Sequence, residues 1–347
     1  MSFGAIVLAV MGLAVLMVVH EGGHYLAARH FGMRVVRFSI GFGPTLYRHQ
    51  PKGSPTIYQV AIIPFLAYVQ IAGMNPYEEN DPKDPGSYLN ASLWARIVTI
   101  AAGPLTNYFF ASVLFFFGFL IGGKAISDET SMRVSVVPGT PAAAAHVVDG
   151  DRIVTAAGQN IGTWDELRKV VGSHPGEAID LGIERDGAPM HIQVTPEPPS
   201  SKDHGKIGIM YYTRTVPVGV SEAAVMSLVE PPRTVVSVVT GLVRVISGKE
   251  KPEFAGPVGM TKEIARVIKI GPGPAFLFLG ALSAYLGAFN LLPVPALDGG
   301  RLIFLFFEGI ARRKPDAKVE AHVHMFGMAV LVCLLLVVTY FDILPSH

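Results

Sequence analysis

Four long apolar segments divide the chain. They run from about Phe3 to Ala28, Leu93 to Ile121, Ala275 to Ile310 and Val323 to Leu344. A membrane-spanning helix needs about 20 mainly apolar residues, which each segment supplies. Pro293 and Pro295 interrupt the third segment and predict a broken helix there. The first segment has no basic residue before Arg29, so a retained helix is favoured over a cleaved signal peptide.

Between the second and third segments the pattern changes to short strand-like stretches separated by turn residues. Strands are predicted at Arg133–Val137, Arg152–Ala156, Ala178–Glu184 and Met190–Thr195, with a short helix at Thr163–Val171. This pattern indicates a small, mainly β module over residues 124–200, which ends in a Pro- and Ser-rich linker. Residues 201–274 are then expected to form an amphipathic linker on the outer membrane face, with breaks at Pro231-Pro232 and Gly271–Pro274.

A further β-like stretch, Thr56–Ile71, lies between the first two apolar segments and is rich in β-branched and aromatic residues. It is interpreted as a hairpin that dips toward the membrane core, where an open strand edge must face protein or a water-filled cavity. An amphipathic surface loop is the alternative, because periodicity is a weak signal over a short run.

Composition agrees with a polytopic membrane protein. The 347 residues are 50% hydrophobic and 16% charged, and the mean hydropathy is +0.42. A net charge of +1 gives no reason to expect nucleic-acid binding. The single cysteine, Cys333, cannot form an intrachain disulfide.

Lysine and arginine distribution orients the four spans. Basic residues gather after the first span and before the fourth: Arg29, Arg34, Arg37, Arg48, Lys52, Lys83, Arg312, Arg313, Lys314 and Lys318. Because cytoplasmic loops carry the excess of Lys and Arg, both loops are expected inside. Both termini and the β module are therefore expected on the outer side.

Candidate chemistry lies at the end of the first span, where His20-Glu-Gly-Gly-His24 occurs. Residues at i and i+4 share a helix face, so both histidines can bind one metal ion while Glu21 stands beside it. Asp298, the lone acid between Ala275 and Gly300, is the candidate third ligand. Two histidines and one carboxylate leave a position for water, whose pKa zinc lowers to about 7. The alternative for Asp298 is a simple ion pair with Arg301.

Other polar residues in apolar surroundings receive different interpretations. Asn290 lies mid-membrane, where its amide can hydrogen-bond a carbonyl group or an oxyanion. His30, His322 and His324 are expected to be interfacial residues rather than ligands, because no acid or cysteine accompanies them.

These motifs together resemble the site-2 protease family, in its bacterial RseP-like branch of intramembrane zinc metalloproteases. The motifs are His20–His24, Ala101-Ala-Gly-Pro-Leu-Thr-Asn107, Asn290-x-x-Pro293-x-x-x-x-Asp298-Gly299, Phe38–Gly43, Gly256–Gly259 and Glu308. Val134–Leu167 is similar to that branch's periplasmic PDZ domain, with one module where well-known members have two.

The resemblance implies a fold: an α-helical polytopic membrane protein with four transmembrane helices, a membrane-reentrant β-loop, and an inserted extracytoplasmic PDZ domain that is α+β and mainly β. Residues 1–123 and 275–347 would form the two halves of the membrane protease core. The resemblance also implies a location in the bacterial inner membrane.

Functional roles follow from the same resemblance. His20, His24 and Asp298 would bind Zn²⁺ and Glu21 would be the catalytic acid/base. Substrate contacts would come from Asn290 and from Tyr68, Val69 and Gln70 of the β-loop, which adds a strand to an unwound substrate helix. The expected substrates are transmembrane segments of single-span membrane proteins, such as anti-sigma factors or signal-peptide remnants.

Two other classes of function remain open at this point. A membrane zinc transporter or scaffold would use the same three ligands but has no use for Glu21. A partner-binding PDZ protein that is merely anchored by its helices would leave the intramembrane His and Asp residues unexplained.

The orientation is testable with reporter fusions to a periplasmic phosphatase, which is active only outside the cytoplasm. We expect activity from a fusion after Ser200 and none from a fusion after Lys83, because the loop that contains Lys83 carries one of the two groups of basic residues. The reverse pattern would overturn the orientation.

Overall fold

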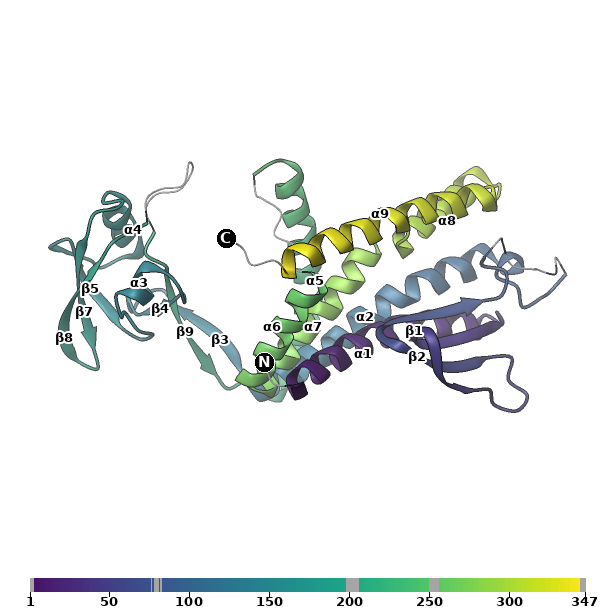
Figure 1. Cartoon of the computed structure of the whole chain (residues 1–347), viewed down its shortest axis with the longest axis horizontal. Coiled ribbons are helices and arrows are strands. Elements are labelled where there is room, and N and C mark those ends of the chain that lie inside the picture. Colours follow the sequence, from purple (N-terminus) through teal and green to yellow (C-terminus); the bar gives the residue numbers. More distant parts are fainter. Residues whose placement is uncertain are drawn as a thin grey trace. The chain divides into compact units, whose positions relative to one another are not determined.

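The computed structural model describes residues 3–75, 77, 81, 83–197, 206–249 and 256–343. These residues form two compact units. The first contains Met1–Gly122 and Val218–His347, and the second contains Gly123–Pro217. The first is mainly helical and the second mainly β (Figure 1).

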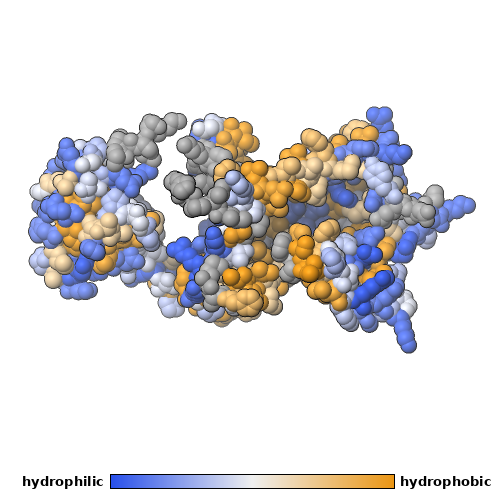
Figure 2. All heavy atoms as spheres, in the orientation of Figure 1, coloured by the Kyte–Doolittle hydropathy of each residue, from blue (hydrophilic) through white to orange (hydrophobic). Residues whose placement is uncertain are grey.

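Four helices of the first unit are long and apolar enough to cross a membrane. They are α1 (Phe3–His30), α2 (Leu93–Gly122), α7 (Pro272–Asn290) and α9 (Ala317–Ile343). Figure 2 shows hydrophobic side chains along α9 and the neighbouring helices, with hydrophilic ones gathered toward the β1–β2 end of this unit. The four predicted spans are therefore confirmed as long apolar helices.

Close packing of α2 against α1 and α7 depends on small residues. A Cβ atom on Gly23 of α1 would lie 2.3 Å from the Ala102 carbonyl oxygen of α2. At the other end of α2, a Cβ on Gly122 would lie 2.9 Å from the Cα of Gly273 in α7. Small residues let helix backbones approach closely, which is how membrane helices gain packing energy without a hydrophobic driving force.

The third apolar segment is broken, as its two prolines predict. Helix α7 ends at Asn290, and the shorter α8 (Asp298–Ala311) begins after a seven-residue link, residues 291–297. Ala296 in this link has a φ of 77°, in the left-handed region that side chains disfavour. The break places Asp298 in the first turn of α8, where the helix dipole favours a carboxylate.

Strand β1 (Val35–His49) pairs antiparallel with β2 (Ile57–Ile71). The β character predicted for Thr56–Ile71 is confirmed, but the hairpin partner is β1, which the sequence pattern did not show. Gly41, Gly43 and Pro44 interrupt the alternation of β1 and weaken its signal. Residues 37–40 of β1 pair with two segments of β2, residues 57–60 and residues 67–70. Ser39 therefore lies opposite both Gln59 and Tyr68. A short 3₁₀ helix, Tyr88–Asn90, precedes α2.

The second unit contains two sheets with strand orders β3-β9-β4 and β6-β5-β7-β8. Its elements are β3 (Lys124–Asp128), β4 (Val134–Val136), α3 (Pro141–Ala144), β5 (Arg152–Ala156), β6 (Gln159–Asn160), α4 (Trp164–Gly172), β7 (Ile179–Arg185), β8 (Ala188–Val194) and β9 (Ile209–Val216). The predicted strands and the predicted helix all lie on these elements. Buried Asp151 is paired with Arg185. Burial raises the pKa of this carboxyl, but the hydrogen bonds from Arg185 and the Val148 N–H, together with the charge of Arg185, lower it below its ordinary value.

One boundary needs correction. The predicted end of the module at residue 200 lies outside the described residues. Residues 206–217 were expected in the linker, but they belong to the second unit because β9 pairs with both β3 and β4. Strand β9 contributes ladder hydrogen bonds that local sequence cannot reveal.

The amphipathic region forms helices α5 (Val220–Ile246) and α6 (Pro257–Ile270). The predicted break at Pro231-Pro232 is wrong, since α5 continues through both prolines. Proline removes a helical hydrogen bond, but Pro231 is buried along with Ala223, Ser227 and Val238, so packing of this face holds the helix together. The break at Gly271 is confirmed between α6 and α7.

Candidate metal centre

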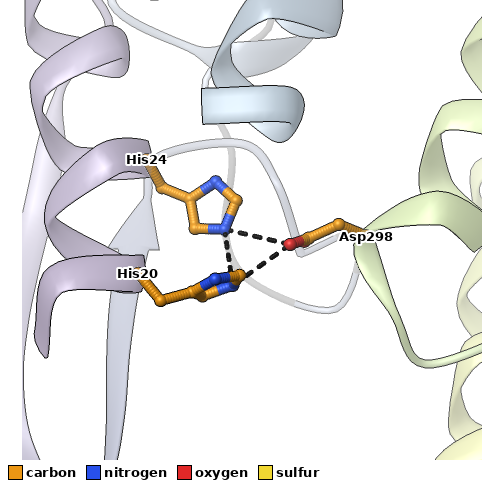
Figure 3. A group of neighbouring side chains, drawn as sticks. All are labelled: His20, His24 and Asp298. Atoms are coloured by element: carbon orange, nitrogen blue, oxygen red, sulfur yellow. Dashed lines mark hydrogen bonds and ion pairs between the residues drawn. The ribbon is translucent and has the colours of Figure 1, made fainter. Parts of the chain in front are cut away.

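The three predicted ligands lie together, although about 270 residues of chain separate the two histidines from Asp298 (Figure 3). His20 and His24 extend from successive turns of α1, and Asp298 approaches from the start of α8. The two Nε2 atoms are 3.3 Å apart. Oδ2 of Asp298 lies 3.2 Å from Nε2 of His20 and 3.3 Å from Nε2 of His24.

This triangle of donor atoms fits zinc. Ligands bonded at about 2.0–2.1 Å to a tetrahedral zinc lie about 3.3 Å apart, close to the three distances observed. Oδ2 of Asp298 is buried and receives no hydrogen bond from any described residue, which a bound cation would explain. Asp298 pairs with the two histidines, and within the described residues it forms no ion pair with Arg301, the alternative partner.

Helix α2 orients both imidazoles through their other nitrogen atoms. Nδ1 of His24 donates to the carbonyl oxygen of Thr99 at 2.8 Å. Nδ1 of His20 lies 3.0 Å from the Asn107 side-chain amide, whose Oδ1 is buried without a partner among the described residues. An imidazole that binds metal through Nε2 carries its proton on Nδ1. Exchanging the amide oxygen and nitrogen of Asn107 therefore gives that proton its acceptor.

Two glycines let α1 and α2 come this close at the site. The Cβ position of Gly103 would lie 2.3 Å from Nε2 of His24, so the imidazole rests directly on the α2 backbone. The Cβ position of Gly23 would lie 2.4 Å from the Thr106 hydroxyl. Gly103 and Asn107 both belong to the motif Ala101–Asn107, but no role at the metal centre was predicted for either residue. A polar residue and a glycine inside an apolar helix were the available signal.

Glu21 lies on the adjacent part of α1 and is not one of the three clustered donors. Its Oε2 accepts the backbone N–H of Val69 at 3.0 Å, which ties α1 to β2. Because Val69 gives its N–H to Glu21, this part of β2 turns a backbone donor toward the metal centre rather than toward β1. Glu21 thus joins the metal centre to a strand edge.

The other predicted substrate contacts, Tyr68, Gln70 and Asn290, lie on β2 and at the end of α7. The Tyr68 hydroxyl accepts hydrogen bonds from Gln59 at 3.2 Å and Arg37 at 3.3 Å, within the β1–β2 sheet. Gln70 follows on the same strand. Asn290 is the last residue of α7, and its amide donates to Leu286 of the same helix at 2.9 Å. Their roles toward substrate remain predictions.

A cavity of about 580 Å³ lies beside the Val69 edge. Residues 68–71 of β2 form one wall, and residues of α2, α8 and α9 form the others. The lining is largely apolar, but it also includes the polar or charged side chains of Arg96, Arg301, Glu308, Glu320 and His324. Arg96 and Glu308 form a two-point ion pair between α2 and α8. The cavity can therefore admit water next to a site otherwise enclosed by apolar helices.

Helix α1 carries the sequence His-Glu-Gly-Gly-His, and the carboxylate of Asp298 completes the group of metal donors. The site lies in a unit with four helices apolar enough to span a membrane. Together these features define a membrane-embedded zinc metalloprotease. The family model described as "Peptidase family M50" matches residues 8–334. The chain belongs to this family, the site-2 proteases.

Named relatives agree with the family. A Rhizobium meliloti protein provisionally named a zinc metalloprotease is 30% identical over 354 residues, covering 95% of this chain and 94% of its own. A similarly named Nostoc protein is 31% identical over 342 residues, covering 94% and 93%. The "Regulator of sigma-W protease RasP" of Bacillus subtilis is 28% identical over 404 residues, covering 93% and 94%. The chain is accordingly a multi-pass membrane zinc metalloprotease.

The zinc site predicts that three ligands act together. Wild-type protein should contain about one zinc per chain, and His24→Ala or Asp298→Ala should contain much less, because each removes one of three protein donors. Metal analysis of the purified proteins measures this. Full zinc retention by Asp298→Ala would contradict its assignment as a ligand, and Asn290 would then be tested.

The adjacent glycines of the motif predict opposite results for the same substitution. Gly23→Ala places a methyl group 2.3 Å from the Ala102 carbonyl oxygen, whereas nothing lies within 4 Å of the Cβ position of Gly22. We expect Gly23→Ala to separate α1 from α2 and reduce zinc content severalfold. Gly22→Ala should keep zinc and gain about 1 kcal/mol of helix propensity. Equal behaviour of the two variants in zinc analysis and thermal unfolding would refute the packing argument.

Proposed function

We propose that this protease hydrolyses peptide bonds within the transmembrane segments of single-span membrane proteins. The observation that carries the proposal is the contact between Glu21 and the Val69 N–H, which places a strand edge against the metal centre. In this proposal His20, His24 and Asp298 hold zinc, and Glu21 is the acid/base.

A transmembrane helix must unwind before it is cut, because its amides are hydrogen-bonded within the helix. Unpaired amides are costly inside a membrane, so an unwound segment needs hydrogen-bond partners. The edge of β2 at Tyr68, Val69 and Gln70 would supply them by strand addition. A substrate carbonyl that accepts the Val69 N–H would also release Glu21 from its present contact. Substrate binding would then free the carboxylate for proton transfer.

Hydrolysis consumes one water and converts the peptide bond into a carboxylate and an amine. Bound zinc would supply Lewis acidity that activates water and polarises the carbonyl. Glu21 would take a proton from the attacking water and deliver it to the leaving nitrogen as the C–N bond breaks. Asn290 would contact substrate or the developing oxyanion, after its amide leaves Leu286.

The proposal includes an orientation. The termini and the second unit would lie outside the cytoplasm, in a bacterial inner membrane, with β1 and β2 as a membrane-reentrant loop. The second unit would be a PDZ domain that excludes or senses large extracytoplasmic domains. Membrane-bound anti-sigma factors are candidate substrates because one relative is named a regulator of sigma-W, and signal-peptide remnants are another candidate class.

Glu21→Gln separates the protease from a zinc transporter or scaffold. The amide keeps an oxygen that can accept the Val69 N–H but cannot transfer a proton. We expect cleavage of a membrane-embedded substrate to fall about 10²–10⁴-fold, while zinc content stays at the wild-type value. Both quantities are measured on the same preparation.

Two results would contradict this mechanism. Near wild-type cleavage by Glu21→Gln would remove Glu21 from the acid/base role. If neither protein cuts any substrate but zinc crosses liposome membranes, the transporter interpretation is correct.

A further inference from the structure

The link between α7 and α8 contains a strained residue close to the third metal ligand. Ala296 has a φ of 77° and precedes Asp298 by two residues. A non-glycine residue in the left-handed region costs about 1–3 kcal/mol and persists only where its surroundings hold it. The link must therefore be held by contacts from elsewhere in the fold.

Helix α9 makes such a contact through His324. The backbone N–H of Ala296 donates to Nδ1 of His324 at 2.9 Å. Nδ1 can accept only when it carries no proton, so this hydrogen bond assigns the ring proton to Nε2. The His324 ring also lies 5.9 Å from the Phe304 ring of α8. One side chain of α9 thus contacts both the strained link and the helix that follows it.

Gly327 supplies a second, independent contact one turn farther along α9. A Cβ atom at this position would lie 2.5 Å from Cβ and 2.7 Å from the carbonyl oxygen of Pro295. The α9 backbone therefore packs directly on the residue before Ala296. Residues at i and i+3 share a helix face. His324 and Gly327 therefore contact two consecutive link residues, Ala296 and Pro295, from the same side of α9.

We propose that His324 is a positioning residue for the metal centre: it holds Ala296 in its strained conformation and so keeps Asp298 directed at His20 and His24. His324 was predicted to be interfacial because no acid or cysteine accompanies it. Its partner is instead a backbone N–H, which the sequence does not reveal. The inference concerns the zinc site alone. It does not depend on where the substrate is cut.

The test compares substitutions of His324 in the full-length protein. Asn keeps an acceptor oxygen near the position of Nδ1, whereas Leu has similar bulk and no acceptor. Residues that support metal ligands typically contribute 10–100-fold to metal affinity. We expect His324→Leu to lose zinc to a chelator about tenfold faster than wild type and His324→Asn to remain near wild type. His322→Leu, on the same helix, is the control, because the His322 imidazole contacts Lys318 and Tyr77 instead.

Hydrogen exchange of the Ala296 amide in zinc-free protein provides a readout independent of metal and of cleavage. His324→Leu should expose this amide, and His324→Asn should protect it. If His324→Leu matches wild type in both zinc loss and exchange, the proposal is overturned. If folded His324→Asn behaves like His324→Leu, the acceptor is not what matters, and the proposal also fails.

A compensating substitution covers the case in which His324→Leu does not fold. Glycine adopts a φ of 77° without the Cβ penalty, so Ala296→Gly should restore part of the zinc retention lost in His324→Leu. Recovery of folded, zinc-binding protein in the double variant supports the proposal, and no recovery overturns it. Because zinc loss and exchange are both read without substrate, these results stand whether or not the proposed cleavage is observed.

Discussion

The close approach of α1 and α2 is the constraint on which the site depends. Only a glycine at position 103 allows the His24 imidazole to rest on the α2 backbone. The same approach brings the Thr99 carbonyl and the Asn107 amide within reach of the two Nδ1 atoms. Polar groups inside a membrane need internal partners. The directions of both imidazoles and the tautomer of each ring thus follow from one helix–helix contact.

Asp298, the ligand on the other side of the site, is positioned in a different way from the two histidines. Asp298 is held by an irregular link whose geometry costs energy, next to helices that are otherwise regular. Irregular backbone at membrane depth is tolerated where it is enclosed by protein or lines a cavity. Here α9 contacts the link through His324, which also lines the neighbouring cavity. Two ligands therefore come from one regular helix packed on α2, whereas the third depends on the contact of an irregular link with α9.

Local patterns were sufficient for part of this structure. The i, i+4 spacing of His20 and His24 and the isolation of Asp298 in an apolar run predicted the donor set, because spacing and burial cost are local properties. Strand β9 and the Glu21–Val69 contact depend on partners far along the chain, and no periodicity reports them. Helix α5 persisted through two prolines because tertiary packing overrode local propensity. Thr99 contributes a backbone carbonyl, which no residue type can signal.

The pairing of β3 with β9 determines how the second unit joins the chain. Lys124 lies opposite Val216, so the strand that enters this unit and the strand that leaves it run side by side. A module whose ends are neighbours can be inserted between two helices without requiring those helices to separate. The helical unit and the inserted unit are thus free to change independently during evolution. Such a junction permits the module to be exchanged, duplicated or lost while the metal centre keeps its architecture.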